Sequence, residues 1–156
     1  MSEVHARKRN LSEFQFYLTA LDIFVEVTTL VHSEKVLPKS RRFTHAIPLT
    51  EMARSIVYNI NKADQFYPNT AHNVLKRREY LTLAIADTEQ LAIEFGLLPR
   101  MGIEVNLNRF EDVTKLIESE IGLLKGARKN VRLIGRQSIE QRIAGLEEQI
   151  AELREV

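Results

Sequence analysis

The stretch AHNVLKRREYLTLAIADTEQLAIEF, residues 71–95, decides the fold of this chain. From Leu81 onward its core-type residues recur at steps of three and four, which is the spacing of one helix face. The predicted core face consists of Leu75, Leu81, Ile85, Thr88, Leu91 and Phe95. Gly96 follows at once and is typical of a helix C-cap. The stretch therefore predicts one long helix, with Lys76, Arg77 and Arg78 in its first half.

Three further segments show helical spacing, at about residues 12–33, at about 40–66, and from Asn106 or Asn108 to beyond residue 124. Pro48 either kinks the second of these helices or marks the first turn of its main part. The predicted core positions are Phe43, Leu49, Met52, Ala53, Ile56, Ile60 and Ala63 in the second segment, and Phe110, Val113, Leu116 or Ile117, Ile121 and Leu124 in the third.

No segment shows strand-like alternation, so the predicted class is all-α. Four long helices with short connections favour an up-down-up-down four-helix bundle. We place this bundle at residues 11–136, after a basic N-terminal arm at 1–10. An additional C-terminal, coiled-coil-like heptad helix occupies 137–156.

Composition narrows the function classes. Hydrophobic residues make up 44% and charged residues 28% of the 156 residues, which is ordinary for a soluble globular protein. Cysteine is absent, which excludes a disulfide framework and a thiol nucleophile and is compatible with a reducing cytoplasm. The chain starts without the apolar core of a secretory signal, and its apolar stretches are too short or too interrupted to span a bilayer. We expect a cytoplasmic protein with no membrane contact.

The predicted helix at 12–33 carries two apolar stripes, whereas a surface helix needs only one. One stripe contains Phe14, Leu18, Leu21 and Val25, and the other contains Phe16, Ala20, Ile23, Val27 and Leu30. Such a helix is either deep in its own bundle or shared with a neighbouring subunit, and for a small bundle we favour the second arrangement. The predicted interface residues are Phe16, Ile23, Val27 and Leu30.

The C-terminal segment has a heptad seam formed by Ile139, Ile143, Leu146, Ile150 and Leu153. Isoleucine at position a with leucine at position d favours a parallel dimer. The alternative is a fifth amphipathic helix packed on its own bundle, because a seam this short is ambiguous. We include these five residues in the predicted oligomer interface.

The formal net charge is only +1, but it is uneven. Residues 137–156 hold five glutamates against two arginines, a net −3, so +4 remains for residues 1–136. The stretch KGARKNVRLIGR, residues 125–136, contains five basic residues and no acidic one. On a helix, Lys125, Arg128, Lys129, Arg132 and Arg136 share one face, which suits a polyanion such as nucleic acid. The alternative is a solvated helix C-terminus whose cations complement the macrodipole.

Several motifs together resemble a known family. They are the entry LPKSRRF at 37–43, the run MARSIVYNINKA at 52–63, RREYL at 77–81 and EIGLLKG at 120–126. This chain is similar to the four-helix-bundle family of 23S rRNA intervening-sequence proteins. Within that family it looks closer to the accessory variability determinant of diversity-generating retroelements. The similarity covers about residues 11–133.

The resemblance implies a bundle that assembles as a homopentamer and binds both the element's reverse transcriptase and nucleic acid, RNA with DNA as a further candidate. Members are needed for mutagenic retrohoming and have no catalytic residues of their own. The basic residues carried over by position are Arg41, Arg42, Arg77, Arg78, Lys125 and Lys129.

The residues themselves give little support to catalysis. No histidine stands three residues after a glutamate, so the Glu-x-x-His motif of di-iron bundles is missing. Asp22 and Glu26 share a helix face but have nothing convergent nearby in sequence, which favours a solvated stripe. We expect no enzyme activity, no cofactor, no metal and no small-molecule substrate. The alternative function is a protein-interaction scaffold, oligomerising through the first helix and the C-terminal heptads without nucleic-acid binding.

Overall fold

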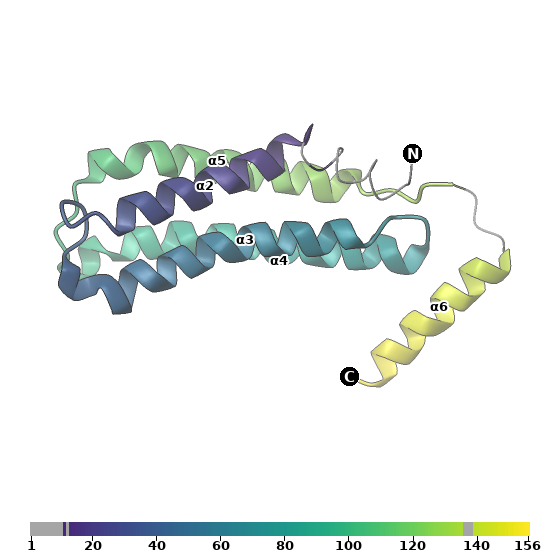
Figure 1. Ribbon diagram of the computed structural model, residues 1–156. Helices are drawn as coiled ribbons and strands as arrows, with labels where there is room; N and C mark the ends of the chain where they lie inside the picture. Colours follow the sequence, from purple (N-terminus) through teal and green to yellow (C-terminus); the bar gives the residue numbers. More distant parts are fainter. Residues whose placement is uncertain (1–10, 12, 136–138) are drawn as a thin grey trace.

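The computed structural model describes residues 11, 13–135 and 139–156, which form helices, turns and short connections (Figure 1). The predicted arm at 1–10, Ser12 and Arg136 lie outside the described residues. The long helices are α2 (Gln15–Val31), α3 (Ile47–Gln65), α4 (Ala71–Leu97), α5 (Leu107–Asn130) and α6 (Ile139–Arg154). The predicted all-α class is confirmed.

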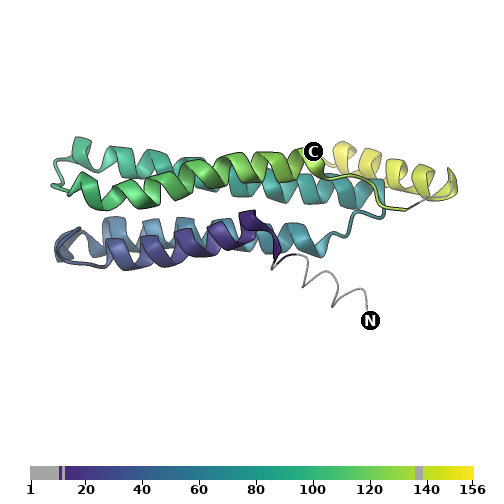
Figure 2. The ribbon, with the colours of Figure 1, turned by 90° about the horizontal axis from the view of Figure 1, so that it is seen from above.

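Helices α2 to α5 form the predicted four-helix bundle in up-down-up-down order (Figures 1 and 2). Helix α2 packs against α3 and α5, and α4 packs against the same two helices. Short connections make consecutive helices antiparallel neighbours. Helix α6 lies outside this ring, against α4.

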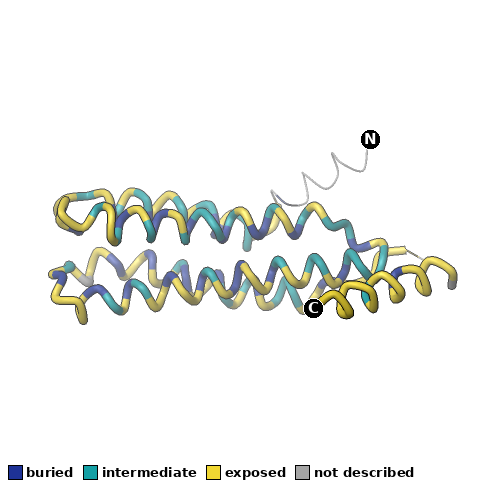
Figure 3. Tube along the Cα trace, turned by 90° about the horizontal axis from the view of Figure 1, so that it is seen from below, coloured by how far each residue is buried: buried dark blue, intermediate teal, exposed yellow. Residues whose placement is uncertain are grey.

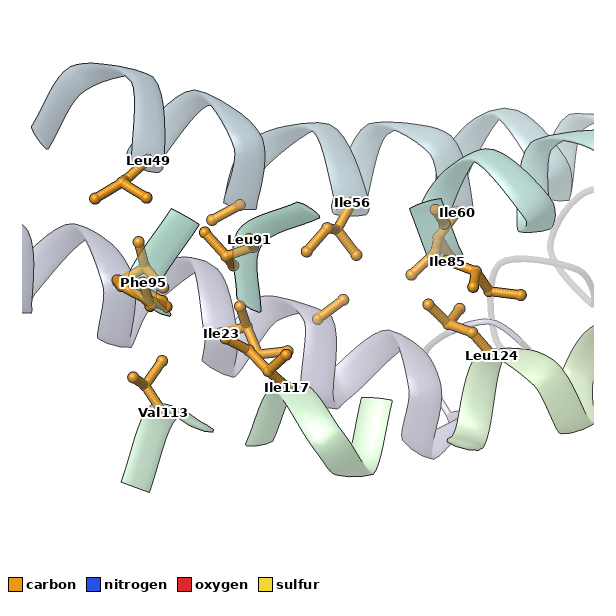
Figure 4. Packing of buried hydrophobic residues seen from close by; sticks show 14 of the residues in the cluster. Ile23, Leu49, Ile56, Ile60, Ile85, Leu91, Phe95, Val113, Ile117 and Leu124 are labelled. Carbon is orange, nitrogen blue, oxygen red and sulfur yellow. The ribbon is translucent and has the colours of Figure 1, made fainter. Parts of the chain in front are cut away.

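One hydrophobic core runs along the bundle axis. Figure 4 shows Ile23 of α2, Ile56 of α3, Leu91 of α4 and Ile117 of α5 pointing toward one another. Each is at most 1% exposed. Burying a side chain of this size contributes about 1.5–3 kcal/mol to stability. The four helices are therefore held together chiefly by apolar packing.

The assignment of the two stripes of α2 is corrected by the structure. Ile23 and Val27, predicted to face a neighbouring subunit, are fully buried in the chain's own core. Phe16 and Leu30 are partly buried and pack against that core. This stripe takes the core position because α3 and α5 both pack on α2 and cover it.

The other stripe of α2 is the one that faces outward. Phe14 is 45%, Leu18 40% and Val25 61% exposed. The sequence shows two apolar faces, but the choice between them depends on which face α3 and α5 cover. An outward apolar stripe is a candidate contact surface.

The segment before α3 departs from the continuous helix predicted at 40–66. A 3-10 turn (Lys39–Arg41) and a π-helical turn (Arg42–Ala46) precede α3. Pro48 lies in the first turn of α3, which confirms the second of the two alternatives. Phe43 was predicted in the core but is 81% exposed. The wider π turn carries an extra residue and shifts side chains off the α-helical face.

Two predicted positions in α4 are wrong. Gly96 is not a C-cap but lies inside the helix, and the left-handed backbone occurs instead at Gly102, with φ +74°. Leu75 is 47% exposed, whereas Val74 is buried. Seven residues complete two helical turns, so Val74 and not Leu75 shares a face with Leu81.

The start of α5 matches the prediction, because the Asn106 side chain accepts a hydrogen bond from the Asn108 amide at 3.1 Å. Its core face differs at one position. Ile121, predicted in the core, is only partly buried, and the fully buried residue is its neighbour Glu120. A carboxyl group therefore occupies a core position between Ile117 and Leu124.

Helix α6 packs on α4 but leaves the described side chains of its heptad seam largely uncovered, as Figure 3 shows by its exposed colouring. The side chain of Ile139, the first predicted seam residue, lies outside the described part of the chain. The exposed fractions are 49% for Ile143, 54% for Leu146, 48% for Ile150 and 76% for Leu153. This is not the packing of a fifth core helix. Within the described residues, no helix is long and apolar enough to cross a membrane.

Candidate nucleic-acid interface

The predicted basic stripe at 125–136 is helical only in its first half. Helix α5 ends at Asn130, and Val131 has extended backbone with ψ 116°. Val131 is buried, and the amide of Ile134 donates to the carbonyl of Pro68 at 2.7 Å. These two anchors draw the chain away from the helix axis. Arg132 therefore follows α5 in a connection instead of continuing its face.

Helix α4 supplies a cation to this end of α5. Arg78 donates from Nη2 to the carbonyl of Val131 at 2.7 Å. Basic side chains favourably bind the last carbonyls of a helix, which lack intrahelical partners. One turn further along α4, the Thr82 hydroxyl accepts a hydrogen bond from Arg128 Nη1 at 3.2 Å. Arg78 and Arg128, far apart in sequence, are thus held on one side of the bundle.

We name this cluster the basic corner. It comprises Arg78 from α4, Lys125, Arg128 and Lys129 from the last turns of α5, and Arg132 from the connection that follows. Two of its members have defined orientations through the hydrogen bonds to Val131 and Thr82. Lys129 and Arg132 are exposed. The corner is therefore partly preorganised and open to solvent.

One carboxylate takes part in an ion pair with the corner. Lys125 Nζ lies 3.4 Å from Glu89 Oε1, and both side chains are about half exposed, at 52% and 49%. Exposed pairs of this kind contribute little and are screened by salt. A phosphate group can compete for Lys125 with little loss. The pair does reduce the local positive charge by one unit.

The structure gives Arg77 a different role from the predicted one. Its side chain is only 18% exposed, and Nη2 lies 3.7 Å from Asp64 Oδ1. Its Nη1 donates to the carbonyl of Phe66 at 3.3 Å, at the end of α3. It also lines a cavity of about 290 Å³ at this end of the bundle. Arg77 is thus a partly buried link between α3 and α4, unlike its exposed neighbour Arg78.

Arg41 and Arg42 lie at the opposite end of the bundle from the basic corner, in the turns before α3 (Figure 1). Arg41 is exposed and Arg42 is partly buried. The predicted nucleic-acid set is therefore divided. The basic corner holds five of the nine residues, and Arg41 and Arg42 lie apart from it. Arg77 is partly buried and lines the cavity together with Arg132 of the corner, and Arg136 lies outside the described residues.

Sequence reasoning missed the groups that organise the corner. Thr82 and Glu89 lie seven residues apart on α4, so they share a face, and this spacing was the available signal.

Sequence reasoning also missed Glu120, whose steps from Ile117 and Leu124 mark a core position. Burial raises the pKa of Glu120 to about 8, because desolvation disfavours the carboxylate.

Asp22 and Glu26 of α2 are both exposed, in agreement with a solvated stripe. The arrangement at the basic corner is suited to holding anions by charge and hydrogen bonding.

No protein-family model matches this chain, and no curated protein matches it either. A four-helix bundle serves many unrelated functions, so the fold alone does not identify one. The established grouping is that of an all-helical protein, a four-helix bundle with an added C-terminal helix.

Proposed function

We propose that this chain is a non-catalytic accessory subunit that binds nucleic acid through the basic corner. As the resemblance implies, its protein partner is the reverse transcriptase of a diversity-generating retroelement. The observation that carries the proposal is that Arg78 of α4 and the end of α5 are joined by hydrogen bonds, Arg78 to the Val131 carbonyl and Arg128 to Thr82, where the sequence adds Lys125, Lys129 and Arg132. A solvated helix end needs no such second helix.

Binding of this kind is electrostatic. Lysine and arginine release counterions from phosphates, which supplies affinity with little reading of base sequence. Arg78 and Arg128 are held by hydrogen bonds to the protein, so less side-chain entropy is lost when phosphate binds. Each guanidinium keeps further N–H donors for phosphate oxygens.

Salt-dependent RNA binding tests the proposal. We expect the variant with alanine at Lys125, Arg128, Lys129 and Arg132 to bind single-stranded RNA at least about tenfold more weakly. Four fewer phosphate contacts should also reduce the slope of log affinity against log salt by about three. The measurement is a fluorescence anisotropy titration at several salt concentrations.

The matched control removes four exposed arginines elsewhere, namely Arg100, Arg109, Arg142 and Arg154. Both variants lose four positive charges, so a difference between them reports where the charges lie and not how many there are. Only the corner variant should show the reduced salt slope. Equal losses in the two variants would mean that net charge, and not the corner, binds RNA. A reverse-transcriptase reading frame and a variable repeat beside the gene would independently support the assignment of the partner.

The proposal includes self-association, as a pentamer by resemblance. An exposed apolar stripe of Leu18 and Val25 on α2, with Phe14 at its N-cap, is a candidate surface for a second copy. It replaces the predicted interface of Ile23 and Val27, which are consumed by the chain's own core.

The exposed seam of α6 favours the second candidate, an interaction scaffold without nucleic-acid binding. Light scattering on the whole chain and on residues 1–136 tests it. If subunits associate through α6, the truncated chain should form an assembly with fewer subunits than the whole chain does. An unchanged oligomer would remove α6 as the joining element and leave the α2 stripe as the candidate.

A further inference from the structure

A mixed set of metal-binding side chains lies where α6 meets α4. His72 belongs to the first turn of α4, and Glu148 and Glu152 belong to α6. His72 Nδ1 lies 3.9 Å from Glu148 Oε2 and 3.8 Å from Glu152 Oε1. All three donor atoms lie within 4.8 Å of one another. From the geometry we propose that these residues bind a zinc-type divalent cation, which fastens α6 to the bundle.

The distances suit such an ion. Zinc binds histidine nitrogen and carboxylate oxygen at about 2.0–2.2 Å, so two ligands of a tetrahedral site are about 3.4 Å apart. The two separations from His72 exceed this by roughly half an ångström, and the two carboxylate oxygens lie within 4.8 Å of each other. Side-chain rotation between staggered positions can bring the three groups to binding distance. The histidine side chain is 19% exposed, so its ring is partly enclosed by the neighbouring residues.

The spacing on α6 supports the same conclusion. Glu148 and Glu152 are four residues apart, which places both carboxylates on one helix face. That face is the one directed at His72. Both carboxylates are exposed, at 61% for Glu148 and 49% for Glu152, so an ion from solvent can reach them. A histidine nitrogen with carboxylate oxygens favours zinc and related transition metals over Mg²⁺ or Ca²⁺, which prefer oxygen ligands.

One protein cation competes with the metal. Lys76 is hydrogen-bonded to Glu79 at 3.3 Å. Glu79 raises the pKa of Lys76, and Glu152 adds a smaller contribution in the same direction. Lys76 therefore gives Glu152 a weak, exposed counterion. It is directed mainly at Glu79, so the proposed ligand oxygens remain available.

The role that follows is structural. Helix α6 packs against α4 while leaving its seam about half exposed, so apolar burial alone holds it weakly. A metal ion that bridges α4 and α6 stabilises the docked arrangement by its own binding free energy. Three protein ligands leave a fourth position for water. The inference does not depend on nucleic-acid binding, because none of the three residues belongs to the basic corner.

Zinc titration of the full chain against a chromogenic chelator tests the site. We expect His72→Ala, and separately Glu148→Gln with Glu152→Gln, to weaken zinc binding by more than about tenfold. Matched controls are Glu147→Gln with Glu155→Gln, which remove the same charge from one exposed position of α6 and one directly after it, and His32→Ala, which removes an exposed histidine elsewhere. Affinities that are equal in all variants would overturn the proposal, since zinc would then be bound adventitiously.

Hydrogen exchange of residues 139–154 tests the structural role. Zinc should slow exchange there at least about threefold in the wild type, because exchange reports local opening. It should leave the His72→Ala variant unchanged. Mg²⁺ at the same concentration should have no effect. Slowing by both ions would indicate general charge screening, and no slowing by zinc would show that α6 is not fastened; either result overturns the clamp.

Discussion

Two carboxyl groups of the bundle are treated differently by their surroundings. Asp87, on α4, accepts hydrogen bonds from Ser55 Oγ at 2.6 Å and Asn59 Nδ2 at 2.7 Å, both from α3. Glu120, on α5, is fully buried, and neither carboxyl oxygen has a hydrogen-bond partner among the described residues. At the α3/α4 interface the carboxylate of Asp87 thus has hydrogen-bond donors. On the α5 side of the core, Glu120 has none within the described part of the chain and is buried chiefly as the neutral acid.

The largest expected effect is the pH dependence caused by Glu120. Burial raises its pKa from the usual 4.5 to about 8. Between these values the folded chain holds one proton more than the unfolded chain, so stability falls as pH rises. The loss should reach about 4 kcal/mol from about pH 5 to about pH 9 and flatten above the folded pKa. Urea denaturation across this range measures it.

Glu120→Gln provides the control for this prediction. The amide has nearly the same shape and does not ionise, so the difference between wild type and variant isolates the carboxyl group. The free energy of unfolding of the variant, relative to that of the wild type, should increase steadily with pH. Parallel pH profiles for the two proteins would show that Glu120 is not held neutral. Glu120→Leu should be more stable still at high pH, because it removes the unpaired polar group.

The sequence predicts much of this bundle because its core follows simple periodicity. Ile56, Leu91 and Ile117 occupy predicted core positions and are buried. Glu120 was not among the predicted core residues because glutamate is usually exposed, and Ile121 was chosen instead. A step of three from Ile117 and four to Leu124 nevertheless places position 120 on the core face, whatever its side chain. Periodicity alone therefore identifies the position, and the residue type argues against it.

The faces that helices turn toward one another were harder to predict. The two stripes of α2 are similarly apolar, and only the placement of α3 and α5 decides that Ile23 is buried while Val25 is exposed. The prediction that the basic stripe continues along one helix face was wrong for a different reason. Its helix ends at Asn130 because Val131 is buried and Ile134 bonds to Pro68, both tertiary effects. Local sequence does not contain them.

The candidate site was predictable in part. Lys125, Arg128 and Lys129 share the end of α5 as expected, and Arg78 joins them. The adjacent arginines of α4 look equivalent in sequence, yet Arg77 makes a partly buried pair with Asp64, and Arg78 faces α5. Neighbouring helix residues point about 100° apart. One arginine can therefore serve the fold and the other a ligand.

Asp87→Ala tests the other half of the comparison, the carboxylate that has hydrogen-bond donors. The change leaves the amide of Asn59, a residue only 7% exposed, without its acceptor. We expect a loss of about 2 kcal/mol in the free energy of unfolding, since an orphaned buried donor costs about 1–3 kcal/mol. Asp87→Asn keeps one acceptor oxygen and should lose less. Equal losses in the two variants, measured by urea denaturation at neutral pH, would point to side-chain packing instead of hydrogen bonding.

Ser55→Ala has the smallest expected effect, because Asp87 keeps its bond to Asn59. Loss of one hydrogen bond to a charged, partly buried acceptor should cost about 1.5 kcal/mol, the lower end of the range for such bonds. The exposed Ser119→Ala, on α5 beside Glu120, is the matched control and should change stability by less than about 0.5 kcal/mol. The double variant Ser55→Ala/Asp87→Ala should be little worse than Asp87→Ala alone, because both changes break the same bond. Strict additivity in this denaturation cycle would mean that Ser55 and Asp87 act separately, and the contrast with Glu120 would then rest on Asn59 alone.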